Sequence, residues 1–200
     1  MTQKEQNSMS LIVIIPPSEE PVTLAEAKLH CKIEVTDDDT LITSLITATR
    51  QQAEHITGRA FCTQTLELVL DAFPDPEAFK LPMPPAIAIT SVKYIDTNGV
   101  EQTLDAAAYS LDKDSQPGSL SPAYDTTWPD TRAVPNAVRV RYTAGYGAAA
   151  AVPASIKSWM LMAIGTLYAS REAIIIGTIT SEVPRGFFAA LLDPYWIPRL

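Results

Sequence analysis

The stretch Asp37–Arg59, DDDTLITSLITATRQQAEHITGR, decides the fold, because it has the pattern of one amphipathic helix with both of its ends. The carboxylate of Asp37 or Asp38 can accept hydrogen bonds from free N–H groups of the first turn. Gly58 fits the left-handed position after the last turn. Between these ends, a mainly apolar stripe recurs at spacings of three or four. It comprises Leu41, Leu45, Ala48, Gln52 and Ile56, with Ile42, Ile46, Thr49 and Ala53 alongside. The stripe predicts a helix that packs against a partner surface, and it specifies no chemistry.

Helices are also predicted before and after this stretch. Thr23 and Glu26 are spaced as a capping box, which predicts a helix that runs to about Ile33. Pro153 suits the first turn of another helix, and apolar residues then repeat with helical period as far as Tyr168. A short helix is expected from about Pro184 to Leu192, with prolines beyond it that prevent a long continuation.

The middle of the chain has the pattern of strands. Residues 11–15, LIVII, form a short β-like run, and from Gln64 alternate leucines predict a half-buried strand. Asn98-Gly99 lies between two β-rich runs and predicts a hairpin, and residues 137–142 predict a further strand. Residues 112–136 are expected to form a long irregular excursion, of the kind that is more often functional or part of an interface than idle.

These patterns together predict an α+β fold. Helices from the N- and C-terminal parts are expected to form one helical core, with a β-rich subdomain inserted at its side. The expected segments are a tail and short strand at 1–15, an N-terminal helical part at 16–62, the β-rich insertion at 63–147, and a C-terminal helical part with a docking tail at 148–200.

Composition and charge narrow the function classes. The 200-residue chain has 15 basic and 23 acidic residues, a net charge of −8, and no basic stripe, which argues against a protein that grips nucleic acid. The apolar run Ser158–Ser170 is too short to span a bilayer, and residues 11–15 are too few for a signal-peptide core, so no membrane partner is expected. Cys31 and Cys62 form no C-x-x-C pair and are predicted to be free thiols.

A search for catalytic and metal-binding patterns is negative. His30 and His55 lie on separate predicted helices without any metal-ligand spacing, and the chain has no G-x-S-x-G or phosphate-binding glycine pattern. Consecutive acids at 37–39 are explained by helix capping rather than by metal binding. We therefore predict no catalytic residues, no metal, no cofactor and no enzymatic activity.

Several blocks of the sequence resemble a known family when taken in order. They are PPSEEPVTLAEAKLH at 16–30, DDDTLITSLITATRQQAEHITGRAF at 37–61, AVRVRYTAGYG at 137–147, VPASIKSWMLMAIGTLYASRE at 152–172 and LLDPY at 191–195. Together they are similar to the head–tail connector (adaptor) proteins of tailed bacteriophages and their prophages. Trp196 stands where the family pattern usually has an arginine.

The resemblance implies a structural role in virion assembly. Such a protein forms a homo-oligomeric ring at the neck of the virion, seated on the portal protein and receiving a tail-side neck protein, after assembly in the bacterial host cytoplasm. DNA passes through the ring without specific binding, and the acidic net charge of this chain fits that expectation.

The C-terminal segment, Pro184–Leu200, is the predicted contact site. It carries more large apolar side chains than a short terminal helix can easily bury against its own domain. Phe188, Leu191 and Leu192 are expected to face inward. The expected interface with the portal or a neighbouring subunit comprises Phe187, Tyr195, Trp196, Ile197 and Leu200. The open alternative is that the whole segment folds back and completes the helical core.

Two other function classes stay open at this point. A non-catalytic, β-rich ligand-binding module could use the hairpin at Asn98-Gly99 and Trp128, and sugar binding by the isolated protein would favour it. A hydrolase that uses scattered Ser, His and Asp residues has no support beyond composition.

Overall fold

The computed structural model describes residues 9–74, 78–170 and 188–197. Contacts between residues divide the chain into two compact units. The strand unit comprises Met1–Pro17 and Thr63–Gly145, and the helical unit comprises Ser18–Cys62 and Tyr146–Arg199.

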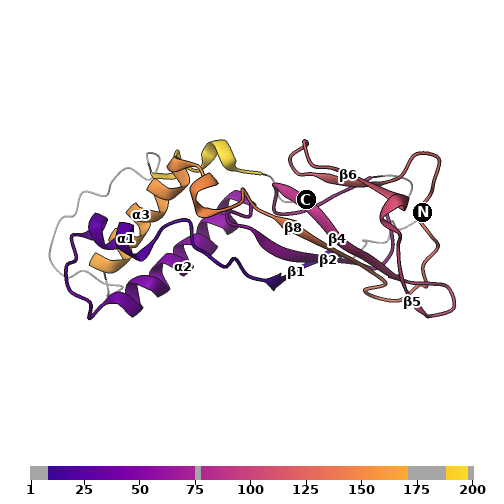
Figure 1. The fold of residues 1–200 in the computed structure, drawn as a ribbon, viewed down its shortest axis with the longest axis horizontal. Helices are drawn as coiled ribbons and strands as arrows, with labels where there is room; N and C mark the ends of the chain where they lie inside the picture. The colour runs from indigo at the N-terminus through magenta and orange to yellow at the C-terminus, as the bar shows by residue number, and fades with distance from the viewer. Residues whose placement is uncertain (1–8, 75–77, 171–187, 198–200) are drawn as a thin grey trace, which may run out of the picture. The chain divides into compact units, whose positions relative to one another are not determined.

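The helical unit contains α1 (Leu24–Cys31), α2 (Asp39–Thr57) and α3 (Ala154–Ala169), shown in Figure 1. The predicted capping box begins α1. The Glu26 N–H donates to Thr23 Oγ1 at 3.2 Å, and the Thr23 N–H donates to Glu26 Oε2 at 2.7 Å. The three helices pack against one another around a shared apolar core.

The ends of α2 differ in how well the sequence predicts them. Gly58 follows the last turn with a φ of +68°, as predicted. Asp38 is the N-cap residue, but its carboxylate makes no capping hydrogen bond. That carboxylate instead accepts a hydrogen bond from the hydroxyl of Tyr168 on α3. Tertiary pairing therefore replaces the predicted local cap.

The buried face of α2 is the row beside the predicted stripe. Leu41 and Ile56 are 37% and 40% exposed, and Ala48 is exposed as well. The buried residues of this face are Ile42, Ile46, Thr49 and Ala53, and they join Ile156, Met160 and Ile164 of α3 in the core. Two adjacent apolar rows allow either orientation of the helix, and the packing of α1 and α3 selects one.

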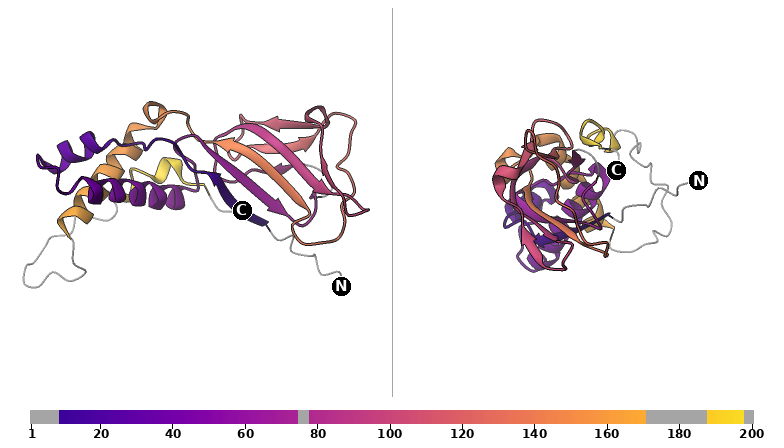
Figure 2. Two further views of the ribbon diagram at one scale, coloured as in Figure 1. Left: turned by 60° about the horizontal axis from the view of Figure 1, so that its bottom comes forward. Right: turned by 90° about the vertical axis from the view of Figure 1, so that its right-hand side faces the viewer.

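The strand unit holds two antiparallel sheets. The larger sheet has the order β1-β2-β8-β4-β5, and the smaller has the order β3-β7-β6 (Figure 2). In the larger sheet, the strands are β1 (Met9–Ile15), β2 (Gln64–Leu70), β8 (Val138–Ala144), β4 (Ala86–Ile95) and β5 (Glu101–Thr103). In the smaller sheet, they are β3 (Phe79–Lys80), β7 (Ser119–Pro122) and β6 (Tyr109–Asp112). Short 3₁₀ helices occur at Ala106–Ala108, Ala149–Ala151 and Asp193–Tyr195.

The predicted hairpin is the connection between β4 and β5. Gly99 has a φ of +86°, and its N–H donates to the Asp96 carbonyl at 2.8 Å. The Asp96 carboxylate accepts from the N–H groups of Asn98 at 2.9 Å and Val100 at 3.0 Å. The prediction from Asn98-Gly99 is confirmed, because the turn is encoded by neighbouring residues alone.

The prediction that the strand after Gln64 is half-buried is wrong. β2 lies between β1 and β8, and nearly all of its residues are buried, including Glu67. The Glu67 carboxylate accepts hydrogen bonds from Arg139 at 2.9 Å and Arg141 at 2.8 Å, both on β8. A carboxylate inside a central strand is tolerated because two guanidinium groups neutralise it and satisfy its oxygens.

The cluster of Glu67, Arg139 and Arg141 makes the free energy of unfolding depend on pH. Burial acts to raise the pKa of Glu67, but hydrogen bonds from Arg141 and Arg139 outweigh it and hold the pKa below its ordinary value of 4.5. Because the folded-state pKa is depressed, the stabilisation is present above pH 4.5 and is lost as the pH falls through the folded-state pKa.

In urea unfolding at pH 7 and pH 3, Glu67→Gln should lose less stability on acidification than the wild type. The control Glu101→Gln removes a carboxylate from an exposed ion pair with Lys93 and should follow the wild type.

The stretch 112–136 is less irregular than predicted. It contributes β7, which lies between β3 and β6 in the smaller sheet. Trp128 stacks on Phe73 with ring centroids 4.7 Å apart, and its ring lies 5.6 Å from that of Phe79. Trp128 is therefore part of an aromatic cluster of the strand unit.

The predicted fold class is wrong. The described residues contain three α-helices and eight strands in two sheets, and the strands form a compact unit of their own rather than an insertion beside a helical core. The N-terminal run is β1, which joins the larger sheet from outside the predicted insertion. The predicted helix at 184–192 lies partly outside the described residues, and Asp193–Tyr195 is a 3₁₀ turn. The order of segments along the chain hid the pairing of β1 with β2, because strand pairing joins residues that are distant in sequence.

Candidate docking surface

The C-terminal segment 188–197 packs on the helical unit. The Phe188 ring stacks on that of Trp159 of α3, with centroids 5.1 Å apart and an angle of 27° between planes. Leu192 is 3% exposed, and Leu191 packs against the same core. The prediction that Phe188, Leu191 and Leu192 face inward is confirmed, because the described contacts place all three on the helical core.

Three hydrogen bonds, two to the backbone and one to a side chain, hold the segment beyond Leu192. Arg59 Nε donates to the Tyr195 carbonyl at 2.6 Å, and the Ile197 N–H donates to the Thr57 carbonyl at 2.9 Å. Ser155 Oγ donates to the Tyr195 hydroxyl oxygen at 3.0 Å. The blocks T-G-R at 57–59 and L-L-D-P-Y at 191–195, far apart in sequence, are thus held together.

Gly58 is required here for two reasons. Its φ of +68° is left-handed, which strains residues that have a Cβ. A Cβ at this position would also lie 3.1 Å from the carbonyl oxygen of Ile197. The glycine at the end of α2 therefore leaves room for the backbone of the C-terminal segment at Ile197.

Tyr146, in the block Y-T-A-G-Y-G, lies beside the residues that follow α2. Its N–H donates to the Phe61 carbonyl at 2.8 Å, which holds it next to the chain that leaves α2. Burial raises the pKa of Tyr146, the nearby Arg59 acts against this by charge and by a hydrogen bond, and Tyr195 adds to the rise. Arg59 is therefore the common partner of residues from two distant parts of the chain.

The predicted interface residues have three outcomes. Trp196 is 60% exposed, whereas Tyr195 and Ile197 are half-buried because they hold the segment to α2 and α3. Phe187 and Leu200 lie outside the described residues. The sequence reasoning did not identify Thr57, Arg59 or Ser155 as anchors. The only available signal was the T-G-R block that follows the second predicted helix.

A buried ion cluster lies beneath the T-G-R turn. Arg50 is 5% exposed, and its Nε donates to Glu20 Oε2 while its Nη1 donates to Glu54 Oε2, both at 2.7 Å. Glu54 Oε1 also accepts from the Phe61 N–H at 2.9 Å. The cluster joins α2 to the chain on both sides of it, so we assign it a structural role.

The two cysteines are free thiols. Burial, with smaller contributions from Glu19, Glu20 and Glu54, raises the pKa of Cys62 to about 12. The thiolate is the nucleophilic form of cysteine, so Cys62 is unsuited to nucleophilic catalysis near neutral pH. The arrangement is that of a structural buried thiol.

No group of three or more His, Cys, Asp or Glu residues is placed to hold a metal ion among residues 9–74, 78–170 and 188–197. His30 and His55 lie on α1 and α2, and both are exposed. No described helix is long and apolar enough to cross a membrane.

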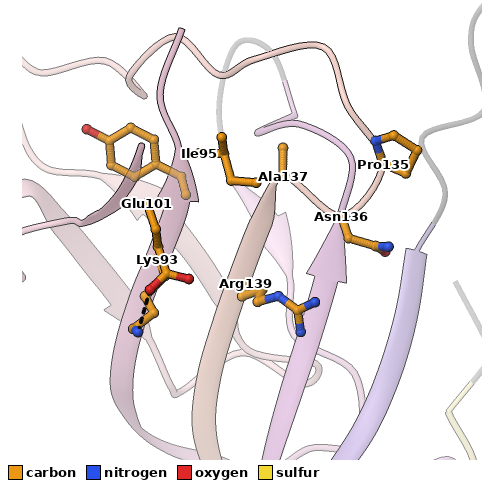
Figure 3. Close-up of a pocket in the computed structure, with 8 residues that line it drawn as sticks. Lys93, Ile95, Glu101, Pro135, Asn136, Ala137 and Arg139 are labelled. Atoms are coloured by element: carbon orange, nitrogen blue, oxygen red, sulfur yellow. Dashed lines mark hydrogen bonds and ion pairs between the residues drawn. The ribbon is translucent and has the colours of Figure 1, made fainter. Parts of the chain in front are cut away.

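A pocket lies beside the β4–β5 hairpin (Figure 3). It is lined by Lys93, Tyr94, Ile95, Glu101, Pro135, Asn136, Ala137 and Arg139. Lys93 is paired with Glu101 at 2.8 Å, and Arg139 donates to Glu67. Trp128 does not line the pocket. The charged groups here already have partners, which gives the ligand-binding alternative little support.

Comparison with protein families gives a match to the phage gp6-like head-tail connector protein over residues 21–116. No curated protein matches the chain. The match includes the capping box, all of α2 and the T-G-R turn, and the T-G-R turn is the part that contacts the C-terminal segment.

Solved structures of gene transfer agent (GTA) particles contain chains with this fold. One, from the neck of an empty particle computed with C6 symmetry, is 21% identical with a TM-score of 0.76, over 96% of this chain and 97% of that chain. Another, from the virion of a native particle, is 20% identical with a TM-score of 0.77, over 95% and 96%. A third, from the neck of a native particle computed with C12 symmetry, is 21% identical with a TM-score of 0.73, over 96% and 97%. The family match confirms, over residues 21–116, the resemblance to head-tail connector proteins predicted from the sequence.

Proposed function

We propose that the chain is a structural neck protein that forms a ring of identical subunits and joins a DNA-filled head to a tail. The observation that carries the proposal is the match of residues 21–116 to the head-tail connector family. The shared fold with chains in particle necks computed with C6 and C12 symmetry supports a cyclic assembly. We assign the protein no catalytic activity, since both comparisons describe structural components.

The C-terminal segment is the proposed contact with the portal protein or a neighbouring subunit. Hydrogen bonds to Arg59 and Thr57 hold the backbone on either side of Trp196, while the Trp196 side chain is 60% exposed. An aromatic side chain on a fixed backbone loses little entropy when it enters a partner's pocket. We include the predicted residues Phe187 and Leu200 in this contact, together with Tyr195, Trp196 and Ile197.

The proposed ring lets DNA pass without gripping it. The chain has a net charge of −8, so an assembled ring repels phosphate over most of its surface. Tight binding of DNA requires clustered lysine and arginine, and two of the arginines of the strand unit, Arg139 and Arg141, are already paired with Glu67. The expected location is the neck of the virion, with assembly in the host cytoplasm.

The oligomeric state tests this proposal. Native mass spectrometry and light scattering of the full chain, over a concentration series and with or without portal-bearing heads, should detect a closed ring in at least one condition. A monomer in every condition, with no binding to the heads, would contradict the proposal. Sugar binding by that monomer would instead favour the ligand-binding alternative at the hairpin.

A further inference from the structure

β1 is an unprotected edge of the larger sheet. It pairs only with β2, and its outer side makes no hydrogen bond to any residue within the described ranges. Four of its apolar side chains are well exposed: Met9 at 44%, Ile12 at 43%, Val13 at 54% and Ile15 at 58%. Proteins usually block such an edge with a charge, a proline or a bulge, because unpaired N–H and C=O groups attract another strand. β1 has no charge and no proline, and its one irregularity lies near its end, between Val13 and Ile15.

The opposite side of the same sheet has a second open stretch. β5 pairs only with Lys93–Ile95 of β4, and the Leu104 N–H donates to the Val92 carbonyl. In the preceding stretch of β4, 86–90, Ala86, Ala88 and Ile89 pair with β8, the register shifts at residues 87 and 90, and no described residue pairs with the stretch on its other side. Ile87 is 41% exposed, and Ala88 and Thr90 are exposed. This stretch offers five residues of backbone to a strand of another chain.

The directions of the two edges are compatible. Every neighbouring pair in the order β1-β2-β8-β4-β5 is antiparallel, so β1 and β4 run in opposite directions. A second copy placed beside the first in the same sense would present its β1 antiparallel to residues 86–90 of β4. The antiparallel alternation of strand directions would then continue from one copy to the next. The added β1 strand would lie along the same edge of β4 as β5.

We propose that β1 of one subunit pairs antiparallel with residues 86–90 of β4 in a neighbouring subunit, so that sheets continue from subunit to subunit around the ring. The inference rests on the proposed function, because it needs an assembly of identical chains. Two different edges meet in each contact, so the contact is head-to-tail, which is the kind that closes into a cyclic ring. Backbone hydrogen bonds supply the pairing, and exposed side chains such as Ile12, Val13 and Ile87 are covered by it.

A pair of matched valine substitutions tests the edge. Val13 on β1 is 54% exposed, and Val35 in the helical unit is 58% exposed. Val13→Lys should prevent ring formation, measured by native mass, because a lysine at the edge disfavours pairing with another strand. Val35→Lys should assemble like the wild type. Both variants should keep the wild-type melting temperature, which separates loss of assembly from loss of folding. Normal rings from Val13→Lys would overturn the inference.

Cysteine cross-linking then tests the partner strand. Val13→Cys is combined in turn with Ile87→Cys, Ala88→Cys and Ile89→Cys, and the assembled particles are oxidised and run on a non-reducing gel. At least one pair should give a ladder of covalent multimers that the single variants do not give, because a disulfide requires Cα atoms closer than about 7 Å. Rings without a ladder from any pair would refute this strand pairing while leaving the proposed function intact. Failure of the wild-type chain to form rings would refute both.

Discussion

Replacing Arg50 with alanine is expected to lower the free energy of unfolding by about 3–5 kcal/mol, the usual cost of removing one partner of a buried ion pair. Arg50 and Glu54 are each 5% exposed, and Arg50 also holds the carboxylate of Glu20 at 2.7 Å. The alanine variant would leave the Glu54 charge buried with its main cation removed. The loss should exceed that from most single substitutions at the surface.

Urea unfolding of the Arg50→Ala variant at pH 7 measures this loss. The matched control is Lys28→Ala, which breaks the more exposed ion pair with Asp39 in the same helical unit. That change should cost no more than about 1 kcal/mol. If Arg50→Ala cost as little as Lys28→Ala, the cluster would not stabilise the turn beneath the C-terminal segment.

Replacing Trp196 with alanine is expected to leave folding intact and to weaken attachment to portal-bearing heads by about 30-fold, which corresponds to about 2 kcal/mol for an aromatic anchor. The side chain is 60% exposed, so few contacts within the subunit are lost. Attachment is measured by sedimentation of the protein with heads, and folding by thermal melt. The control Tyr124→Ala removes a fully exposed aromatic side chain from the strand unit and should attach normally.

Deletion of Ile197–Leu200 separates docking from folding in a second way. It removes the hydrogen bond from the Ile197 N–H to the Thr57 carbonyl as well as the end of the chain. A variant that melts normally and fails to attach would support the docking role. Normal attachment by both this variant and Trp196→Ala would remove that role, and loss of folding would assign the segment to the core of the helical unit.

Local signals in the sequence were reliable where neighbouring residues alone determine the structure. The capping box of Thr23 and Glu26, the left-handed Gly58 and the turn at Asn98-Gly99 all lie as predicted. Each of these local conformations is favoured by residues a few positions apart, so it could be predicted without knowledge of the distant contacts.

Features that depend on distant residues were predicted poorly. The capping role of Asp38 was displaced by Tyr168, which is 130 positions away. The burial of Glu67 depends on two arginines more than 70 positions later. The fold class was wrong because the pairing of β1 could not be inferred from five apolar residues followed by two prolines.

The same distinction between local and distant signals applies to the candidate docking surface. The exposed aromatic residue Trp196 could be proposed from composition, because many large apolar side chains crowd a short terminal segment. Its anchors could not, since Arg59 and Tyr195 are 136 positions apart. Only the shared order of sequence blocks hinted that both ends of the chain serve one surface.

The most direct measurement is electron microscopy of particles produced with and without this chain. If the protein joins head to tail, cells that lack it should accumulate filled heads and free tails, and wild-type protein supplied in trans should restore joined particles with a ring at the neck. Joined particles in normal number without the protein would contradict the account.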